Sequence, residues 1–149
     1  MPLVFFDRIC TGVNASRVVI DDYHGAFTAT KYLIDTGCKR IAFCGSSLHL
    51  EIVKNRMNGY KDALRLHEME INNDYILECD SRELAEQMIP SLMQGEHRPD
   101  AFFCINDDTA IGVIHVVKRL GFKIPEDVSI CGFTNCERAL ACDPMITTM

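Results

Sequence analysis

Polar side chains that could orient a small molecule stand shortly after the apolar runs of this sequence. These residues are Asp7, Ser46, Ser81, Asn106 and Thr134. Their carboxylate, hydroxyl and amide groups supply the hydrogen-bond donors and acceptors that a polyol or a heterocycle requires in a cleft. In an open parallel sheet the ligand binds beyond the carboxyl ends of the strands, so the five residues would share one edge. We therefore expect a ligand site at that edge.

Each of these polar residues also has a local explanation. Ser81 and Asn106 can cap the helices that follow them, and Asp7 and Thr134 can belong to turns. Taken one at a time, these structural roles are the more common ones. The shared position of the residues at one sheet edge favours a ligand site for the group as a whole.

The elements that would position these residues alternate between strands and helices. Apolar runs predict strands over residues 3–6, 18–20, 41–44, 75–79, 101–105 and 128–131, and helical patterns lie between most of them. Such βαβ units build a mostly parallel sheet with helices on both faces. The predicted fold class is therefore α/β, a parallel-sheet sandwich.

Capping residues predict where the helices begin and end. Asp21 or Asp22 can begin a helix that ends at Gly37, a residue suited to a left-handed C′ position. Asp80 has capping-box spacing before a further helix. Pro90 lies inside that helix and removes a backbone hydrogen bond, so we expect a kink or a split there.

Apolar spacing predicts which face of each helix is buried. One helix carries a stripe of Val53, Met57, Tyr60 and Leu64. The helix over 107–120 is apolar almost all round, which suggests contacts on more than one side. Its Ala110, Val113 and Val117 can face the sheet, whereas Ile111 and His115 lie on a side that could meet another subunit.

Composition and charge exclude several classes of protein. The 149 residues are 48% hydrophobic and 24% charged, as in an ordinary globular domain. A net charge of −6 with scattered Lys and Arg argues against nucleic-acid binding by this chain alone. Neither a signal sequence nor a membrane-spanning apolar run is evident, so the sequence predicts a cytoplasmic protein without a membrane partner.

The eight cysteines contain no C-x-x-C pair that would indicate a zinc site. Cys44, Cys79, Cys104 and Cys131 fall in or beside apolar runs and are expected to be small core residues in a reducing cytosol. Cys10 and Cys38 lie elsewhere in the chain, and Cys136 and Cys142 lie in a loop-like stretch. We expect no metal and no disulfide.

Catalytic motifs are not found in the sequence. It contains no G-x-S-x-G elbow, no H-E-x-x-H and no glycine-rich phosphate loop, and its five histidines are dispersed. The sequence therefore predicts a binding protein rather than an enzyme, with no cofactor.

Several segments together resemble one protein family. VVIDDYHGAFTATKYLIDTGCKRIAFCG, RMNGYKDAL, PDAFFCINDDTAIGVIHVVKRLGFKIPEDVSICGF and the closing PMITTM resemble, in order and spacing, effector domains of LacI/GalR transcription regulators. The resemblance covers essentially the whole chain. It implies a two-lobed fold of the type I periplasmic-binding-protein kind, of which this chain is mainly the C-terminal lobe.

The resemblance also implies a division of the chain and the parts that would lie outside it. Residues 1–16 would end the N-terminal lobe and cross over, 17–144 would form the C-terminal lobe, and 145–149 would begin the return crossover. The DNA-binding headpiece would be absent. A periplasmic-type solute-binding protein for sugar transport shares this fold and is the alternative.

Roles for individual residues follow from the resemblance. Arg56 matches the arginine that grips the effector, Asn106 matches the cleft asparagine, and Asp7 matches a cleft position of the first lobe. Ser81 stands where many relatives have an aromatic ring, and Thr134 where many have aspartate. These departures weaken the case for a plain sugar and leave a sugar acid or a nucleobase-like effector open, since the Arg56 fork suits a carboxylate.

Assembly and mechanism are likewise implied by the family. Its members are homodimers, and here Ile111, His115 and Cys142 would contribute to the interface. Effector bound between the lobes would change their relative angle and so alter contact with operator DNA through the headpiece. The thermodynamic basis is differential affinity for two lobe arrangements.

Overall fold

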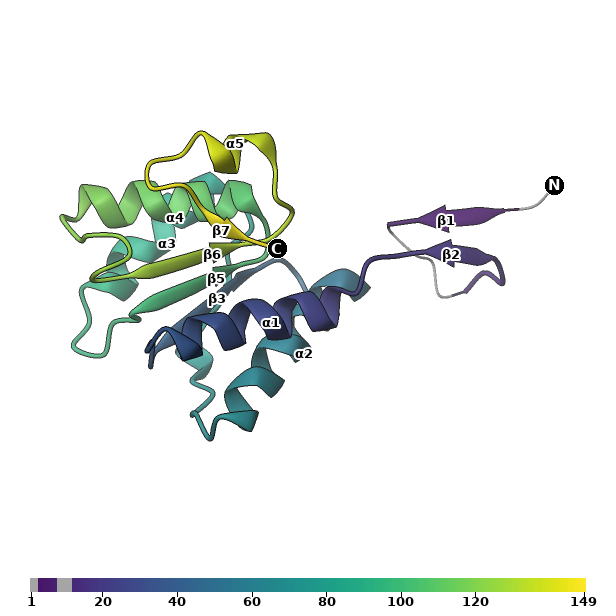
Figure 1. Cartoon of the computed structure of the whole chain (residues 1–149), viewed down its shortest axis with the longest axis horizontal. Helices are drawn as coiled ribbons and strands as arrows, with labels where there is room; N and C mark the ends of the chain where they lie inside the picture. The colour runs from purple at the N-terminus through teal and green to yellow at the C-terminus, as the bar shows by residue number, and fades with distance from the viewer. Residues whose placement is uncertain (1–2, 8–11) are drawn as a thin grey trace.

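The structure of the chain is a computed structural model that describes residues 3–7 and 12–149. A five-stranded sheet lies between helices, and a small two-stranded sheet extends from it to one side (Figure 1). All neighbouring strands in both sheets are parallel. The order in the larger sheet is β4-β3-β5-β6-β7, with β3 Ile41–Gly45, β4 Ile76–Glu78, β5 Ala101–Cys104, β6 Ser129–Gly132 and β7 Thr147–Thr148.

The two central strands are apolar along their whole length because helices cover both faces of the sheet. Every residue of β3 and β5 is buried. Their register pairs Phe43 with Phe103, and these two rings pack 5.7 Å apart between centroids. A continuous apolar run is the pattern expected of a strand inside a parallel sheet.

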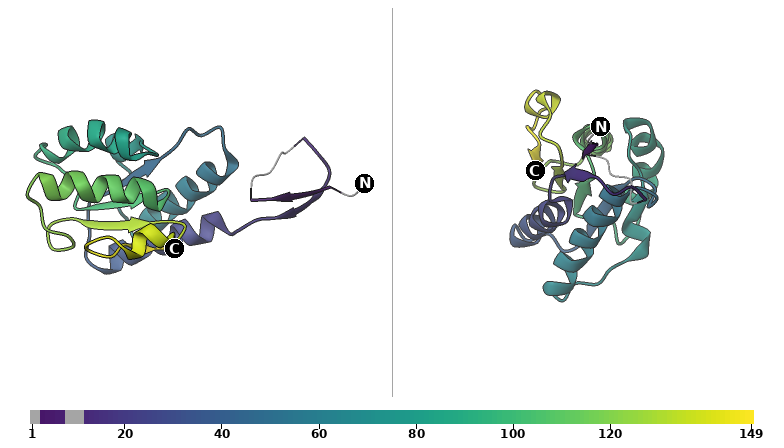
Figure 2. Two further views of the ribbon diagram at one scale, coloured as in Figure 1. Left: turned by 90° about the horizontal axis from the view of Figure 1, so that it is seen from above. Right: turned by 90° about the vertical axis from the view of Figure 1, so that its right-hand side faces the viewer.

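Two pairs of helices form the outer layers, as the views in Figure 2 show. The pair α1 and α2 packs on one face of the sheet, and the pair α3 and α4 packs on the other. The predicted α/β sandwich is therefore confirmed. The long helices are α1 Asp22–Asp35, α2 Glu51–Leu66, α3 Arg82–Met93 and α4 Asp107–Arg119, and a short helix α5 spans Glu137–Leu140. A 3-10 turn at Asn73–Tyr75 lies between α2 and β4.

The helix α2 buries the stripe that its spacing predicts. Val53, Met57, Tyr60 and Leu64 are all buried. The Tyr60 hydroxyl donates to the Ile41 carbonyl at 2.8 Å, which satisfies the one polar atom of this core ring. Burial raises the pKa of Tyr60, so the hydroxyl keeps its proton for this bond.

Close approach of α1 and α2 depends on a glycine. A Cβ atom placed on Gly59 would lie 2.3 Å from the Tyr23 carbonyl oxygen. Any larger residue would push the two helices apart.

The predicted start of α1 is confirmed, because the Asp21 side chain accepts from the backbone N–H of His24.

The helix α3 differs from the sequence prediction at its N-cap. Its N-cap is Ser81, whose hydroxyl accepts from the Leu84 N–H at 3.2 Å, so the expectation that Asp80 caps it was wrong by one residue. The extended backbone of Ser81 gives it the cap geometry. The helix is not split at Pro90 but continues to Met93, since Ile89 and Met93 are anchored in the core.

The smaller sheet consists of β1 Val4–Phe6 and β2 Ser16–Val18. The predicted strand 18–20 was therefore shifted: pairing ends where Asp7 N–H donates to the Val18 carbonyl, and the chain then runs to α1. Three apolar side chains of this sheet, Val4, Phe6 and Val18, are more than half exposed, and Phe5 is partly buried. In Figure 1 it lies beyond the first turn of α1, away from the helical layers.

The cysteines of the described residues are free thiols, and Cys10 lies outside those residues. Cys44, Cys79, Cys104 and Cys131 are fully buried, as predicted. Burial raises the pKa of Cys131 to about 12, so this thiol stays protonated at neutral pH. Within residues 3–7 and 12–149, no helix has the length and apolar character that crossing a membrane requires.

Candidate functional site

A cavity of about 200 Å³ opens at the carboxyl edge of the central strands. Three of the predicted site residues, Ser46, Arg56 and Asn106, line it. They come from the loop after β3, from α2 and from the loop after β5. Its apolar wall is made by Leu50, Ile52, Val53 and Ile105, and the acidic residue Asp80 also lines it.

Arg56 is the most constrained polar group of this cavity. Its side chain is 5% exposed, and its guanidinium carbon lies 3.7 Å from the centroid of the Phe133 ring. The Nε and Nη2 atoms contact Asp22 Oδ1 at 2.8 and 2.7 Å, and Nη1 donates to the Ile105 carbonyl. These contacts fix the plane of the guanidinium, so Arg56 lines the cavity in a preorganised position.

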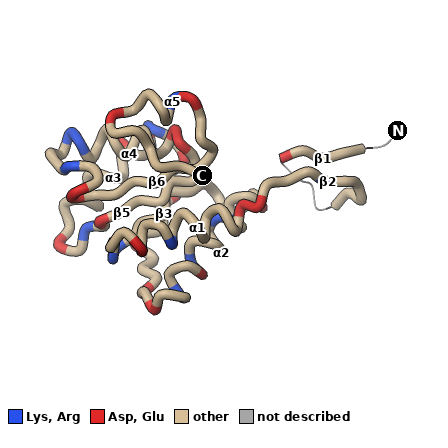
Figure 3. Tube along the Cα trace, viewed as in Figure 1, with Lys and Arg blue, Asp and Glu red and all other residues tan. Residues whose placement is uncertain are grey.

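Asp22 neutralises the buried charge of Arg56. Desolvation raises the pKa of this carboxyl, and the hydrogen bond and charge of Arg56 oppose that increase. The charges of Asp7 and Asp21 raise the pKa of Asp22 further. Figure 3 shows the acidic residues gathered where β2 leads into α1. The cavity therefore contains no uncompensated positive charge from Arg56.

Asn106 joins two of the loops that surround the cavity. Its Oδ1 atom accepts from the Thr109 N–H at 2.8 Å and so caps α4. Its Nδ2 donates to the Asp80 carbonyl at 3.4 Å. The residue thus has the local cap role considered from the sequence and also lines the cavity.

Asp7 lies beside the cavity rather than in it. It lines a smaller space of about 60 Å³ with Asp22, Leu50 and Ile52, and the last two residues also line the Arg56 cavity. Asp7 has a positive φ of 64°, in the left-handed region. The two spaces are neighbours on either side of the start of α2.

Ser81 and Thr134 are not part of the Arg56 cavity. Ser81 lines a separate cavity of about 440 Å³. Asp80 and Asn106 line both this cavity and the Arg56 cavity. Thr134 is exposed, has a φ of 110°, and donates its hydroxyl to Asp107 at 3.2 Å. The structure therefore brings three of the six predicted residues together and sets the other three around them.

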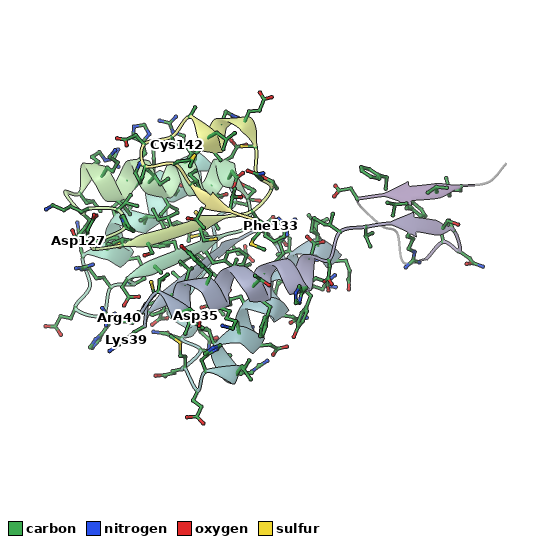
Figure 4. All side chains as sticks on the ribbon, in the orientation of Figure 1. Asp35, Lys39, Arg40, Asp127, Phe133 and Cys142 are labelled. Carbon is green, nitrogen blue, oxygen red and sulfur yellow. The ribbon has the colours of Figure 1, made fainter. Side chains whose placement is uncertain are left out.

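A second cavity, of about 730 Å³, lies at the other end of the sheet. It is lined by Lys39 and Arg40, which Figure 4 shows at the end opposite Phe133. The backbone N–H groups of these two residues already donate to Asp100, and Arg40 Nε donates to a carbonyl. None of the six predicted site residues lines this cavity, whereas three line the Arg56 cavity, so we place the candidate site there.

Comparison with known proteins agrees with this architecture. Residues 30–149 match the periplasmic binding protein-like domain. The chain belongs to this family. It is 34% identical over 153 residues to the HTH-type transcriptional repressor PurR of Vibrio vulnificus and 33% identical over 150 residues to the ribose operon repressor of Haemophilus influenzae. In both cases the match covers 100% of this chain and 45% of the relative, so the chain spans about half their length.

Solved structures of LacI-type regulators show the same periplasmic-binding-protein-like fold. A putative LacI regulator from Bacillus cereus subsp. cytotoxis matches with a TM-score of 0.90 at 32% identity, over 99% of this chain and 53% of that one. The complex of the regulator CelR with cellobiose matches with a TM-score of 0.87 at 27% identity, over 97% and 45%. The predicted resemblance to LacI-type regulators is thereby confirmed.

The three residues that the family implies for a dimer interface lie on one side of this periplasmic-binding-protein-like domain. His115 is exposed on α4, and its Nδ1 lies 3.4 Å from Arg82. Ile111 and Cys142 are partly buried and pack against the core beneath α4 and α5. Figure 4 shows Cys142 next to α5, far from the small β1–β2 sheet.

Sequence reasoning missed three residues of this edge of the periplasmic-binding-protein-like domain. Asp22 was considered only as a helix start, and Phe133 only as part of a motif. Asp107 appeared only as the first residue of the helix over 107–120. Their long-range partners carry no local pattern, since Arg56 and Asp22 are 34 positions apart. The one available signal was the presence of a second acidic residue beside the Asp21 cap.

Proposed function

We propose that this chain is the small-molecule effector-sensing part of a LacI-type DNA-binding transcription regulator. The observation that carries the proposal is the Arg56 cavity: a buried, preorganised arginine with Ser46 and Asn106 at the carboxyl edge of a parallel sheet. Relatives that carry repressor names over the whole of this chain support the regulatory role. A transport protein of the same fold is the second candidate, and the names of these relatives favour regulation over it.

The effector that fits this site best is a neutral polar molecule, either a sugar or a nucleobase-like compound. The charge of Arg56 is balanced by Asp22, and Asp80 adds a negative charge to the cavity. A sugar acid would therefore meet no free cation here and would face Asp80. Stacking of Arg56 on Phe133 adds a planar surface near the ligand.

The wider organisation is part of the same proposal. Residues 17–144 form the C-terminal lobe, residues 1–16 belong to the end of the N-terminal lobe and its crossover, and residues 145–149 begin the return. Effector binding between the lobes would shift their equilibrium through differential affinity. The protein would act in the cytoplasm as a homodimer that uses Ile111, His115 and Cys142 at its interface, with no enzymatic activity.

Contact with operator DNA would be made by a separate headpiece. Lys and Arg are interspersed with Asp and Glu over this chain (Figure 3), and its net charge is −6. Phosphate binding requires clustered positive charge. The distribution supports a sensing role for this part of the protein and a separate DNA-reading part.

The experiment is a thermal-shift screen of the complete polypeptide that carries this chain. The probes are D-ribose, cellobiose, hypoxanthine and the sugar acid D-ribonate. We expect at least one neutral probe to raise the melting temperature, and we expect D-ribonate to have no effect.

Two variants assign the response to the cavity. Arg56→Lys keeps a cation for Asp22 but loses the fork that makes its paired contacts, so it should abolish the shift. Arg138→Lys is the matched control, because Arg138 pairs with Asp108 in an exposed position. The proposal fails if no probe shifts the wild type, or if Arg56→Lys responds as the wild type does.

A further inference from the structure

Asp107 is a fully buried carboxylate at the first position of α4, outside the Arg56 cavity. Its Oδ2 accepts from the Cys136 N–H at 2.7 Å and from the Thr134 hydroxyl at 3.2 Å. Its Oδ1 accepts from the Thr148 hydroxyl at 2.6 Å. All three partners are donors, so only a group that accepts in several directions satisfies them. The start of α4 adds a favourable dipole for the negative charge.

These donors come from two segments that are separate in the sequence. Thr134 and Cys136 belong to the loop that follows β6, and Thr148 belongs to β7. The two segments also bond directly, because Thr134 N–H donates to the Met149 carbonyl at 2.8 Å and Asn135 N–H donates to Thr148 Oγ1 at 3.1 Å. Asp107 therefore joins the loop, the strand and the start of α4.

The backbone around Asp107 has the conformation that this arrangement imposes. Thr134 has a φ of 110° and Asn135 a φ of 48°. A β-branched residue in this region is strained and persists only when surrounding contacts hold it. A Cβ atom on Gly132 would lie 2.2 Å from Asp107 Oδ1, so a glycine is required for the carboxylate to approach β6.

We propose that Asp107 is a positioning residue of the effector site: it holds the loop 133–136 in its strained conformation, and it joins that loop to β7. The loop carries Phe133, which packs on Arg56, and Thr134, which was predicted to contact the ligand. The effect on the ligand rests on the proposed function, whereas the effect on the loop does not.

A rule for ligand chemistry follows from the same contacts. The Thr134 hydroxyl has one proton and gives it to Asp107. It can offer a ligand only the lone pairs of its oxygen. Thr134 lies outside the Arg56 cavity, so the rule applies to a ligand that extends from that cavity to Thr134: the group it places there is a hydrogen-bond donor, a hydroxyl or an N–H, and not a carboxylate or phosphate oxygen.

The first test needs no ligand and uses amide hydrogen exchange on the complete polypeptide. Asp107→Asn keeps the shape of the side chain but turns an NH₂ group toward a donor. We expect exchange in the segment 133–136 to rise at least about ten-fold, from loss of hydrogen bonds of order 1.4 kcal/mol or more, while β3 and β5 exchange as in the wild type. Asp108→Asn, the exposed neighbour paired with Arg138, is the matched control and should change neither.

Two results would overturn the proposal. One is unchanged exchange in 133–136. The other is a uniform increase throughout the sheet, which marks general destabilisation rather than positioning.

If Asp107→Asn does not fold, Thr148→Val and Thr148→Ser replace it: valine removes the hydroxyl and should release the loop, whereas serine keeps the hydroxyl and should not. Equal exchange in these two variants would contradict the proposal.

The second test measures the affinity of a neutral probe that shifts the wild type, among D-ribose, cellobiose and hypoxanthine. Thr134→Val and Asp107→Asn should each weaken its binding at least ten-fold, whereas Thr134→Ser should bind within a few-fold of the wild type. Wild-type affinity in Asp107→Asn would refute the positioning role. If no probe binds the wild type, the proposed function fails, and the exchange experiment alone decides the role of Asp107.

Discussion

Two buried charges lie at the same edge of the sheet and are satisfied in different ways. Arg56, on the side of α1 and α2, pairs with the opposite charge of Asp22 and stands beside an open cavity. Asp107, on the side of α4, is held by two hydroxyls and one backbone N–H. Arg56 is thus held at the wall of an open cavity, whereas Asp107 is held by the chain segments that it joins next to that cavity.

Removal of Asp22 should have the largest effect on the Arg56 side. Asp22→Ala leaves a buried guanidinium without its counter-charge, and we expect a loss of about 3–5 kcal/mol in the free energy of unfolding. Urea denaturation measures this quantity. Asp21→Ala is the control: it removes only the cap of α1 and should cost about 1 kcal/mol. If Asp22→Ala and Asp21→Ala lose the same free energy of unfolding, the Arg56–Asp22 ion pair stabilises the protein no more than the helix cap does.

A smaller loss is expected when the approach of Asp107 to β6 is blocked. In Gly132→Ala the new methyl group would overlap Asp107 Oδ1, so the carboxylate must shift away from its donors. We expect a loss of about 1–3 kcal/mol in unfolding free energy, measured in the same way.

The control for this change is Gly12→Ala. A Cβ atom at Gly12 meets nothing within 4 Å, so this variant should be close to neutral. If Gly132→Ala is as stable as Gly12→Ala, the tight contact between β6 and Asp107 is not a constraint on the fold.

The smallest expected effect is a pH dependence of stability that comes from Asp22, on the Arg56 side of the sheet edge. The folded-state pKa of Asp22 lies above its ordinary value of 3.8, chiefly because of desolvation. The folded protein therefore takes up this proton before the unfolded chain does. The contribution of Asp22 to stability must fall as the pH rises through the folded pKa. The difference in unfolding free energy between wild type and Asp22→Asn should decrease as the pH rises above 3.8 and through the folded-state pKa of Asp22.

Carboxyl NMR signals provide the direct check on this pH dependence. Asp22 should titrate above 3.8 in the folded protein. A titration midpoint below 3.8 would show that the charge of Arg56 outweighs desolvation.

Much of the architecture could be predicted because it depends on local patterns. The stripe from Val53 to Leu64 sets the buried face of α2, and the apolar run before Asn106 sets a central strand. The rule that ligands bind beyond the strand ends predicted that Ser46 and Asn106 share one sheet edge, and both line the Arg56 cavity there. Arg56 came from family resemblance, since an arginine on a helix is by itself most often a surface residue.

The features that the sequence did not predict depend either on a choice between adjacent capping residues or on geometry between distant segments. The shift of the α3 cap from Asp80 to Ser81 is a one-residue difference between two good capping residues. The left-handed backbone of Thr134 arises from contacts with Asp107 and β7, and threonine has no intrinsic preference for it. The pairing of Arg56 with Asp22 likewise requires the packing of α2 against α1.

We propose that Arg56 and its cavity bind a neutral effector. The most direct measurement is calorimetric titration of the complete polypeptide and of its Arg56→Lys variant with the neutral probe that gives the largest thermal shift. The account predicts saturable binding to the wild type, at least ten-fold weaker binding to Arg56→Lys, and no binding of D-ribonate. Equal affinity of the two proteins for the probe, or tighter binding of D-ribonate than of any neutral probe, would contradict it.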